Sequence, residues 1–308
     1  MVERVEEIDI AKGICILLMV VGHSGLTGMG HDMIYAFHMP FFFFISGVTT
    51  NVERSFRVFS ISKIKGLLLP FCIYYTIHIP CYAFVYQNNI IDYFLSEILN
   101  KIDGALWFIP ILFFSQMINW LIPRHDFIEI VAVLVLASIS SFLCLEGIQL
   151  PWNFSTLGFS TSFVLLGRIM SLGGAKNVIG SGLSTVRLMI FSSVTLLLLL
   201  IISSHYQLAM YFDNIEPILP IMVGALSGIG CVLLISSLVR RKCLRLSHFL
   251  AYTGVNTFVF IGLSQFIIKL ENLYIKDYFV LKYVILFLAL YGIIYVKNLF
   301  PIAKKLRL

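Results

Sequence analysis

Charged residues are scarce in this 308-residue chain. Asp, Glu, Lys and Arg make up 12% of it, whereas soluble domains carry roughly 25%. Apolar residues make up 59%, and the mean hydropathy is +0.94. This composition excludes an ordinary soluble domain and predicts an integral membrane protein, with the lipid bilayer as its immediate partner. We expect no nucleic-acid partner despite the net charge of +6, because the basic residues follow the loops of a membrane protein.

The chain also lacks a long hydrophilic segment, a visible internal repeat and a low-complexity tract. These absences predict a single transmembrane domain over residues 1–308 without a soluble appendage. A cleavable signal peptide is not expected, since residues 1–9 are acidic and no small-residue cleavage site follows the first apolar run. The six cysteines show no spacing typical of a zinc site or a disulfide framework, so no metal is expected.

The apolar residues that are present fall into about ten runs, each near the roughly 20 residues that a membrane-spanning helix needs. This pattern predicts an all-α, polytopic fold of about ten transmembrane helices. A count of nine or eleven stays open, because only a few residues join the fourth run to the fifth. The runs are Ile8–Leu26, Met33–Thr50, Gly66–Tyr86, Gly104–Ile122, Phe127–Leu145, Phe154–Leu172, Arg187–Ser203, Pro217–Leu238, Ser247–Ile268 and Tyr278–Val296.

The basic residues are distributed unevenly over the segments that join these runs. Sixteen of the 22 Lys and Arg residues lie on every second segment, counted from the N-terminus, and three lie on the segments between these. Because Lys and Arg concentrate on the cytoplasmic side, both termini are predicted to be cytoplasmic. The outer segments hold more acids than bases, which we interpret as solvated loop residues. The sixteen inner residues are Arg4, Arg54, Arg57, Lys63, Lys65, Arg124, Lys176, Arg187, Arg240, Arg241, Lys242, Arg245, Lys297, Lys304, Lys305 and Arg307.

Ionisable residues inside membrane spans are costly and therefore indicate function. Lys12 and His23 are eleven positions apart, so on a helix they point the same way, about 16 Å apart along the axis. Asp9 is close enough to pair with Lys12, although snorkelling to the inner interface is an alternative for that lysine. His38 precedes Pro40, which we expect to bend the second helix and free carbonyls nearby. A short outer loop joins the two runs, so both histidines are expected to share a cavity.

The opening of the chain resembles a known family. IDIAKGICILLMVVGH (8–23), followed by FHMPFFFFISG (37–47), is similar to the start of the membrane acyltransferase family 3, which includes the O-acetyltransferases of bacterial surface polysaccharides. The segments KIKGLLLPF (63–71), GALWFIPILFF (104–114), FVLLG (163–167) and YTGVNTFVFIGLSQ (252–265) agree more weakly. Many relatives carry a histidine in the ninth span, where this chain has Ser264 and Gln265, so a mechanism that depends on that histidine does not carry over.

The resemblance implies an O-acetyltransferase of the bacterial inner membrane. Its acyl donor would be cytoplasmic acetyl-CoA. Its acceptor would be a hydroxyl of a surface or secreted polysaccharide, or of its lipid-linked precursor. The implied site residues fall into three groups: His23 and His38 for catalysis; Lys12, Arg57, Lys63 and Lys65, with Asp9 orienting Lys12, for acyl-CoA; and Asn256, Gln265 and Trp107 for the acceptor or the oxyanion.

Several alternatives stay open at this point. His23 can serve as a general base on the acceptor hydroxyl, or it can take the acetyl group itself as a nucleophile. The sugar, the hydroxyl, the acyl length and the oligomeric state are not assigned. A transporter or flippase would also suit Pro- and Gly-interrupted spans, but the intramembrane charges cluster in the first span and no inverted repeat is visible. An inactive relative that serves as a membrane scaffold is the third class.

Overall fold

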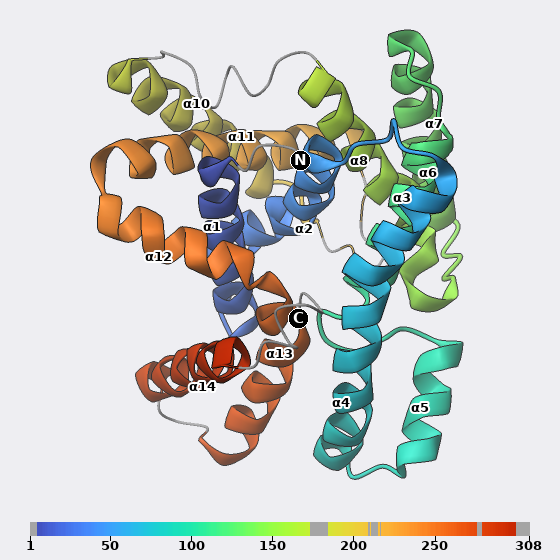
Figure 1. Ribbon diagram of the computed structural model, residues 1–308, viewed down its shortest axis with the longest axis vertical. Coiled ribbons are helices and arrows are strands. Elements are labelled where there is room, and N and C mark those ends of the chain that lie inside the picture. The colour runs from blue at the N-terminus through green and yellow to red at the C-terminus, as the bar shows by residue number, and fades with distance from the viewer. Residues whose placement is uncertain are drawn as a thin grey trace. The chain divides into compact units, whose positions relative to one another are not determined.

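The computed structural model describes residues 5–172, 184–208, 210, 215, 217–275 and 279–299. All regular structure within these residues is helical (Figure 1), which confirms the predicted all-α class for this part of the chain. The described residues divide into two compact units. Unit 1 comprises Met1–Arg54, Phe114–Gln149 and Asn153–Val255, and unit 2 comprises Ser55–Phe113, Leu150–Trp152 and Asn256–Leu308. Outside the described residues lie the predicted loop cations Arg4, Lys176, Lys276, Lys304, Lys305 and Arg307 and the predicted start of the tenth run at Tyr278.

Unit 1 is a bundle centred on α2. Helix α2 packs against α1, α8, α10 and α11, while α1 also packs against α11 and α12, and α7 packs against α8. The helices of this unit are α1 (Glu6–His23), α2 (Met29–Thr49), α7 (Asp126–Leu145), α8 (Leu157–Leu172), α10 (Thr185–Ser203), α11 (Ile218–Lys242) and α12 (Leu244–Val255).

Glycines allow two of these helix pairs to come into backbone contact. A Cβ at Gly13 would overlap the backbone of Leu250, and one at Gly254 would overlap the backbone of Asp9, so α1 and α12 approach each other through reciprocal glycines. Helices α2 and α8 approach in the same way through Gly47 and Gly167. Small residues at such crossings are typical of helix packing in membranes.

Unit 2 is built on one long helix. Helix α3 (Phe56–Lys63), the π-helical turn η1 (Ile64–Leu68) and α4 (Leu69–Tyr86) follow each other without a break as a 31-residue rod. Helix α5 (Ile90–Leu99) packs against α4, and α13 (Thr257–Tyr274) packs against α4 and α14 (Phe279–Leu299). Helix α6 (Phe108–Leu121) and the 3₁₀ turn η2 (Pro151–Thr156) each contain the boundary between the units.

Five of the described helices are long and apolar enough to cross a membrane, and a sixth is obtained if the broken pair α12 and α13 counts as one span. A multi-pass membrane protein is thus supported, whereas the count of ten and the cytoplasmic termini stay predictions. Helix α1 carries four charged residues in its first seven positions, and α8 and α6 have only 16 and 14 residues. The five are Phe56–Tyr86, Asp126–Leu145, Thr185–Ser203, Ile218–Lys242 and Val280–Leu299.

Three details of the predicted runs and loops were wrong. The third helix begins at Phe56 rather than Gly66, because the basic segment before the apolar run is itself helical and continues directly into it. The ninth run is not one helix, since the chain breaks at Asn256 between α12 and α13. The outer segment after the third run is not a simple loop but contains α5, whose start is capped by the Asn89 side chain accepting from the Ile91 N–H.

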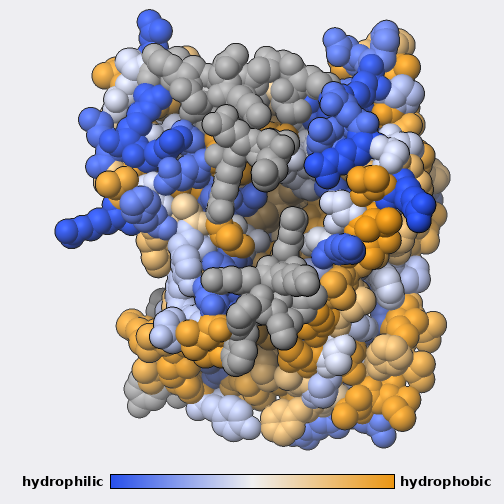
Figure 2. Space-filling model, viewed as in Figure 1, coloured by the Kyte–Doolittle hydropathy of each residue, from blue (hydrophilic) through white to orange (hydrophobic). Residues whose placement is uncertain are grey.

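The surface of both units carries large apolar side chains, as expected for helices in contact with lipid. Ile91 and Leu99 on α5 are 67% and 69% exposed, and Val280 and Leu288 on α14 are 73% and 69% exposed. Figure 2 shows such side chains on one face of the molecule.

An ion pair lies inside unit 1. The Nη2 atom of Arg168 on α8 lies 3.0 Å from Oε1 of Glu129 on α7, and both side chains are 1% exposed. Arg168 Nη1 also donates to the Asn119 carbonyl at 2.5 Å. A buried charge is tolerated only when it is paired and hydrogen-bonded, so these contacts explain how Arg168 is accommodated within a predicted span.

Candidate functional site

The end of α1 and the first half of α2 bring three ring side chains together in unit 1. The Tyr35 hydroxyl lies 2.7 Å from Nδ1 of His23. The rings of His23 and His38 are edge to face with centroids 5.9 Å apart, and the Tyr35 and His38 centroids are 5.0 Å apart. His38 is buried, and His23 is half-buried. The two histidines that the sequence singled out are therefore neighbours, with Tyr35 between them.

Local sequence explains why these rings meet. His31, Tyr35 and His38 are spaced by four and three residues, so they share one face of α2. The His31 ring stacks on the Tyr35 ring with centroids 3.9 Å apart. Gly22, next to His23, allows α1 to approach this face, because a Cβ there would lie 3.2 Å from Ile34 Cγ2. Tyr35 and His31 were missed by the sequence reasoning, although the 4-and-3 spacing was a visible signal.

The proton positions on His38 follow from its partner. Its Nδ1 lies 2.9 Å from the Ile34 carbonyl oxygen. A carbonyl only accepts hydrogen bonds, so Nδ1 carries the proton and Nε2 carries the lone pair. Pro40 was expected to free carbonyls near His38. The missing N–H of Pro40 would have reached Ala36, four residues earlier, whereas His38 uses the Ile34 carbonyl.

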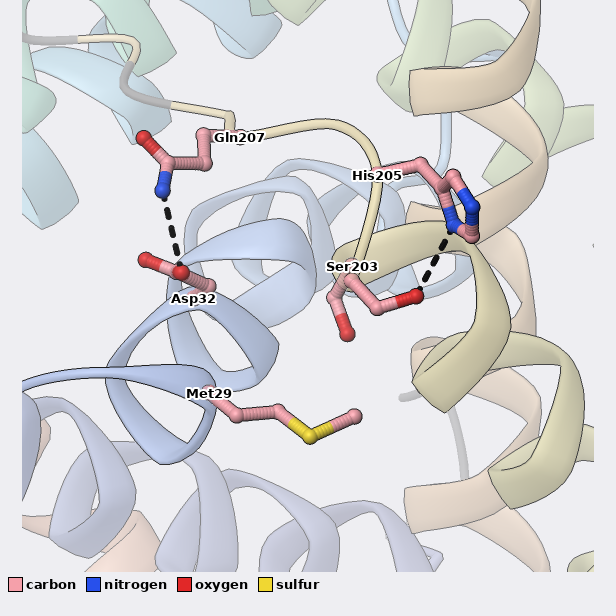
Figure 3. Close-up of a pocket in the computed structure, with 6 residues that line it drawn as sticks. Met29, Asp32, Ser203, His205 and Gln207 are labelled. Carbon is pink, nitrogen blue, oxygen red and sulfur yellow. Dashed lines mark hydrogen bonds between the residues drawn. The ribbon is translucent and has the colours of Figure 1, made fainter.

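A polar pocket opens beside this cluster in unit 1. It has a volume of about 480 Å³, and Asp32 and Gln207 lie on one side of it with Ser203 facing them (Figure 3). Gln207 Nε2 donates to Asp32 Oδ2 at 3.1 Å, and the other carboxylate oxygen lies 3.1 Å from His31 Nδ1. Asp32 therefore connects the pocket to the stacked rings of α2. The lining residues are Met29, Asp32, Ser203, Ser204, His205 and Gln207.

The opposite end of α1 carries charged groups. Lys12 Nζ lies 3.7 Å from Asp9 Oδ1, which confirms that these two side chains are close enough to pair. Arg240, at the end of α11, pairs with Glu6 and Glu7 in the first turn of α1. The acids are favourably placed at a helix N-terminus. Because α1 is continuous from Glu6 to His23, Lys12 and His23 lie on one helix, about 16 Å apart along its axis.

The other predicted donor residues lie in unit 2, at the start of the long helix. Arg57 and Lys65 are exposed, and Lys63 places its Nζ 5.3 Å from the Phe59 ring centroid. On an ideal α-helix Lys63 points about 240° away from Arg57, while Lys65 lies in the π-helical turn η1. Arg57 and Lys63 therefore lie on different faces of α3.

The predicted acceptor residues are also in unit 2. Asn256, at the helix break, is buried, and its Oδ1 accepts from Lys297 Nζ at 2.5 Å. Trp107 is buried at 4% exposure. In α13 the buried Nε2 of Gln265 and the buried Oγ of Ser264 have no hydrogen-bond partner among the described residues.

Across the described ranges no group of three or more His, Cys, Asp or Glu side chains is placed to hold a metal ion.

Comparison with protein families matches residues 5–298 to a family described as an acyltransferase domain. The match covers the ring cluster, the charged end of α1 and the predicted site residues of unit 2. Comparisons with curated proteins and with solved structures found no match.

Proposed function

This chain belongs to the acyltransferase family 3, and on that basis we propose that it is a membrane-embedded O-acetyltransferase of the bacterial inner membrane. Its donor is cytoplasmic acetyl-CoA. Its acceptor is a hydroxyl of a surface or secreted polysaccharide, or of the lipid-linked precursor of that polysaccharide.

The observation that carries this proposal is the placing of two functional groups at the ends of α1. A lysine held beside Asp9 stands near one end, and a histidine in a cluster of rings stands at the other. Lys12 is a point cation that can hold a phosphate or a pantetheine carbonyl. The roughly 16 Å along the helix suits an extended pantetheine arm, whose thioester would then reach His23. Arg57, Lys63 and Lys65 of unit 2 are the further cations that the family resemblance implies for acyl-CoA.

The chemistry requires one base. An imidazole nitrogen takes the proton of the acceptor hydroxyl while the oxygen attacks the thioester carbonyl carbon. The carbon–sulfur bond then breaks, and the leaving thiolate receives a proton to give the free thiol of CoA. Nδ1 of His23 is engaged by Tyr35, so Nε2 is the nitrogen available for this step. Transfer through an acetyl-imidazole on the same nitrogen uses the same groups in two steps.

The test measures release of CoA thiol by the purified full chain in lipid nanodiscs, with acetyl-CoA and bacterial polysaccharide as substrates. We expect acceptor-dependent release from the parent, and loss of release from His23→Ala and His38→Ala. His248→Ala is the matched control, because His248 is exposed on α12. Thermal unfolding of each variant separates lost chemistry from lost folding. A folded His23→Ala variant with parental turnover would disprove the catalytic role.

A further inference from the structure

The polar pocket of unit 1 has no role in the proposal so far, although it connects to the ring cluster through Asp32. We propose that this pocket is the acceptor subsite and that it binds a neutral sugar through two neighbouring hydroxyl groups. The inference rests on the proposed acetyl transfer and adds the place and the chemical class of the acceptor. The volume of the pocket, about 480 Å³, falls in the range of small-molecule sites.

The side chains of the pocket offer the hydrogen-bonding groups that hydroxyls need. Among the described residues, one carboxylate oxygen of Asp32 contacts His31 and the other contacts Gln207, while an ionised carboxylate has about four acceptor positions. The Gln207 amide keeps its carbonyl oxygen and a second N–H for the ligand. The Asp32 carboxylate can therefore accept from one hydroxyl, and the Gln207 amide beside it can donate to or accept from the next.

The opposite wall completes this pattern. The Ser203 and Ser204 hydroxyls donate to carbonyls one turn earlier, at 3.4 Å to Leu200 and 2.7 Å to Ile201. The Ser204 oxygen also lies 2.9 Å from Nδ1 of His205, and each hydroxyl oxygen has a second lone pair, so both can still accept a hydrogen bond from a ligand. Met29, which is 49% exposed, supplies an apolar contact for the C–H face of a sugar ring. The pocket thus combines a few directed polar groups with one apolar side, as ligand sites do.

The pocket is connected to the proposed catalytic group by three successive contacts. Asp32 meets His31 at 3.1 Å, His31 stacks on Tyr35 at 3.9 Å between centroids, and Tyr35 meets His23 at 2.7 Å. A sugar held by Asp32 would therefore lie beside the face of α2 that leads to His23. The predicted acceptor residues Asn256, Gln265 and Trp107 belong to unit 2, so the two assignments can be tested separately.

The charge of the pocket restricts the acceptor further. A carboxylate at hydrogen-bond distance repels another carboxylate, and repulsion in a partly buried site exceeds that in bulk water. Asp32 is half-buried, as is its partner His31. We therefore expect neutral hexosides and deoxyhexosides to be preferred to uronic acids.

The experiment uses the full chain in nanodiscs with saturating acetyl-CoA. Methyl glucoside, methyl galactoside and methyl fucoside are the neutral acceptor probes, and methyl glucuronide is the acidic one. A lost hydrogen bond to a charged group corresponds to about tenfold to a hundredfold in affinity. Asp32→Asn should raise the KM for neutral probes by about that factor, and Gln207→Leu, which removes neutral hydrogen bonds, by about twofold to tenfold. Both should leave the KM for acetyl-CoA unchanged. Asp32→Asn should also weaken the discrimination against the glucuronide. Glu146→Gln, an exposed acid after α7, is the matched control.

A second readout keeps the subsite separate from the reaction. Saturation-transfer NMR measures binding of the same glycosides without turnover. Binding by the parent that is lost in Asp32→Asn supports the subsite even if no acetyl group is transferred, and that outcome would reject the proposed function alone. Parental binding and parental acceptor KM in both Asp32→Asn and Gln207→Leu would overturn the subsite while leaving the acetyltransferase proposal intact. Failure of the parent to bind any of the four probes would also overturn it.

Discussion

Replacing Tyr35 by Phe tests the ring cluster with a minimal change. The substitution removes only the hydroxyl that lies 2.7 Å from His23 Nδ1. It keeps the ring that stacks on His31 and meets His38 edge to face. Because the apolar contacts persist, we expect the thermal unfolding temperature to change little. The effect should appear in turnover instead.

The size of the effect follows from the role of the hydroxyl. When His23 Nε2 takes a proton, the imidazolium has an N–H at Nδ1 as well, and the Tyr35 oxygen must accept from it. A hydrogen bond to a charged group contributes about 1.5–3 kcal/mol, which corresponds to a factor of about ten to a hundred and fifty in rate. Since the bond is strongest in the protonated state, kcat should fall by this factor, while the KM values for donor and acceptor stay near those of the parent.

The assay is steady-state release of CoA thiol, with both substrates varied. Tyr295→Phe is the matched control, since Tyr295 on α14 is 67% exposed. A Tyr35→Phe variant with kcat within about twofold of the parent would refute the argument that Tyr35 stabilises a charged His23.

Three further predictions follow from the charged groups. Lys12→Ala should raise the KM for acetyl-CoA with a smaller change in kcat, and Lys12→Arg should recover part of the loss, as donor saturation curves would show. Glu129→Ala removes the carboxylate that pairs with the buried Arg168, so it should destabilise the fold by about 3–5 kcal/mol and lower the unfolding temperature clearly. Burial alone would raise the pKa of Asp103, but hydrogen bonds from Lys269 and Tyr86 hold it below its ordinary value. A carboxylate whose pKa is lowered by folding stabilises the fold above pH ~4, and this stabilisation is lost as the pH falls. On acidification the parent should therefore lose more stability than Asp103→Asn does.

Each of these predictions has a control and a contradicting result. Matching donor saturation curves for Lys12→Ala and the parent would remove Lys12 from the donor site. Glu53→Ala breaks the exposed pair with Arg124, which should cost at most about 1 kcal/mol, and equal losses in Glu53→Ala and Glu129→Ala would contradict the burial argument. Parallel acid-unfolding curves for the parent and Asp103→Asn would contradict the pKa argument.

The parts of the site that depend on one helix could be predicted from the sequence. The spacing of Lys12 and His23 and the pairing of Asp9 with Lys12 depend only on helix geometry, and α1 is continuous over these residues. The proximity of His23 and His38 needed one further inference, that a short loop joins two antiparallel helices.

The features that were missed depend on contacts between segments far apart in the chain. Asp32 was interpreted as a solvated loop acid, because nothing local shows that Gln207 lies against it. Glu129 stands within a predicted span without having been singled out, and its partner Arg168 follows 39 residues later. The break at Asn256 lies within an apolar run without proline, so composition alone predicted one helix there.

The most direct measurement is mass spectrometry of the surface polysaccharide from cells with the parent protein, from cells with His23→Ala, and from cells that lack the gene. We predict that acetyl esters disappear equally from the last two and that the modified sugar is identified from the first. Acetyl esters that persist unchanged in His23→Ala cells with normal levels of the protein would contradict the assignment of α1 and its histidine to acetyl transfer.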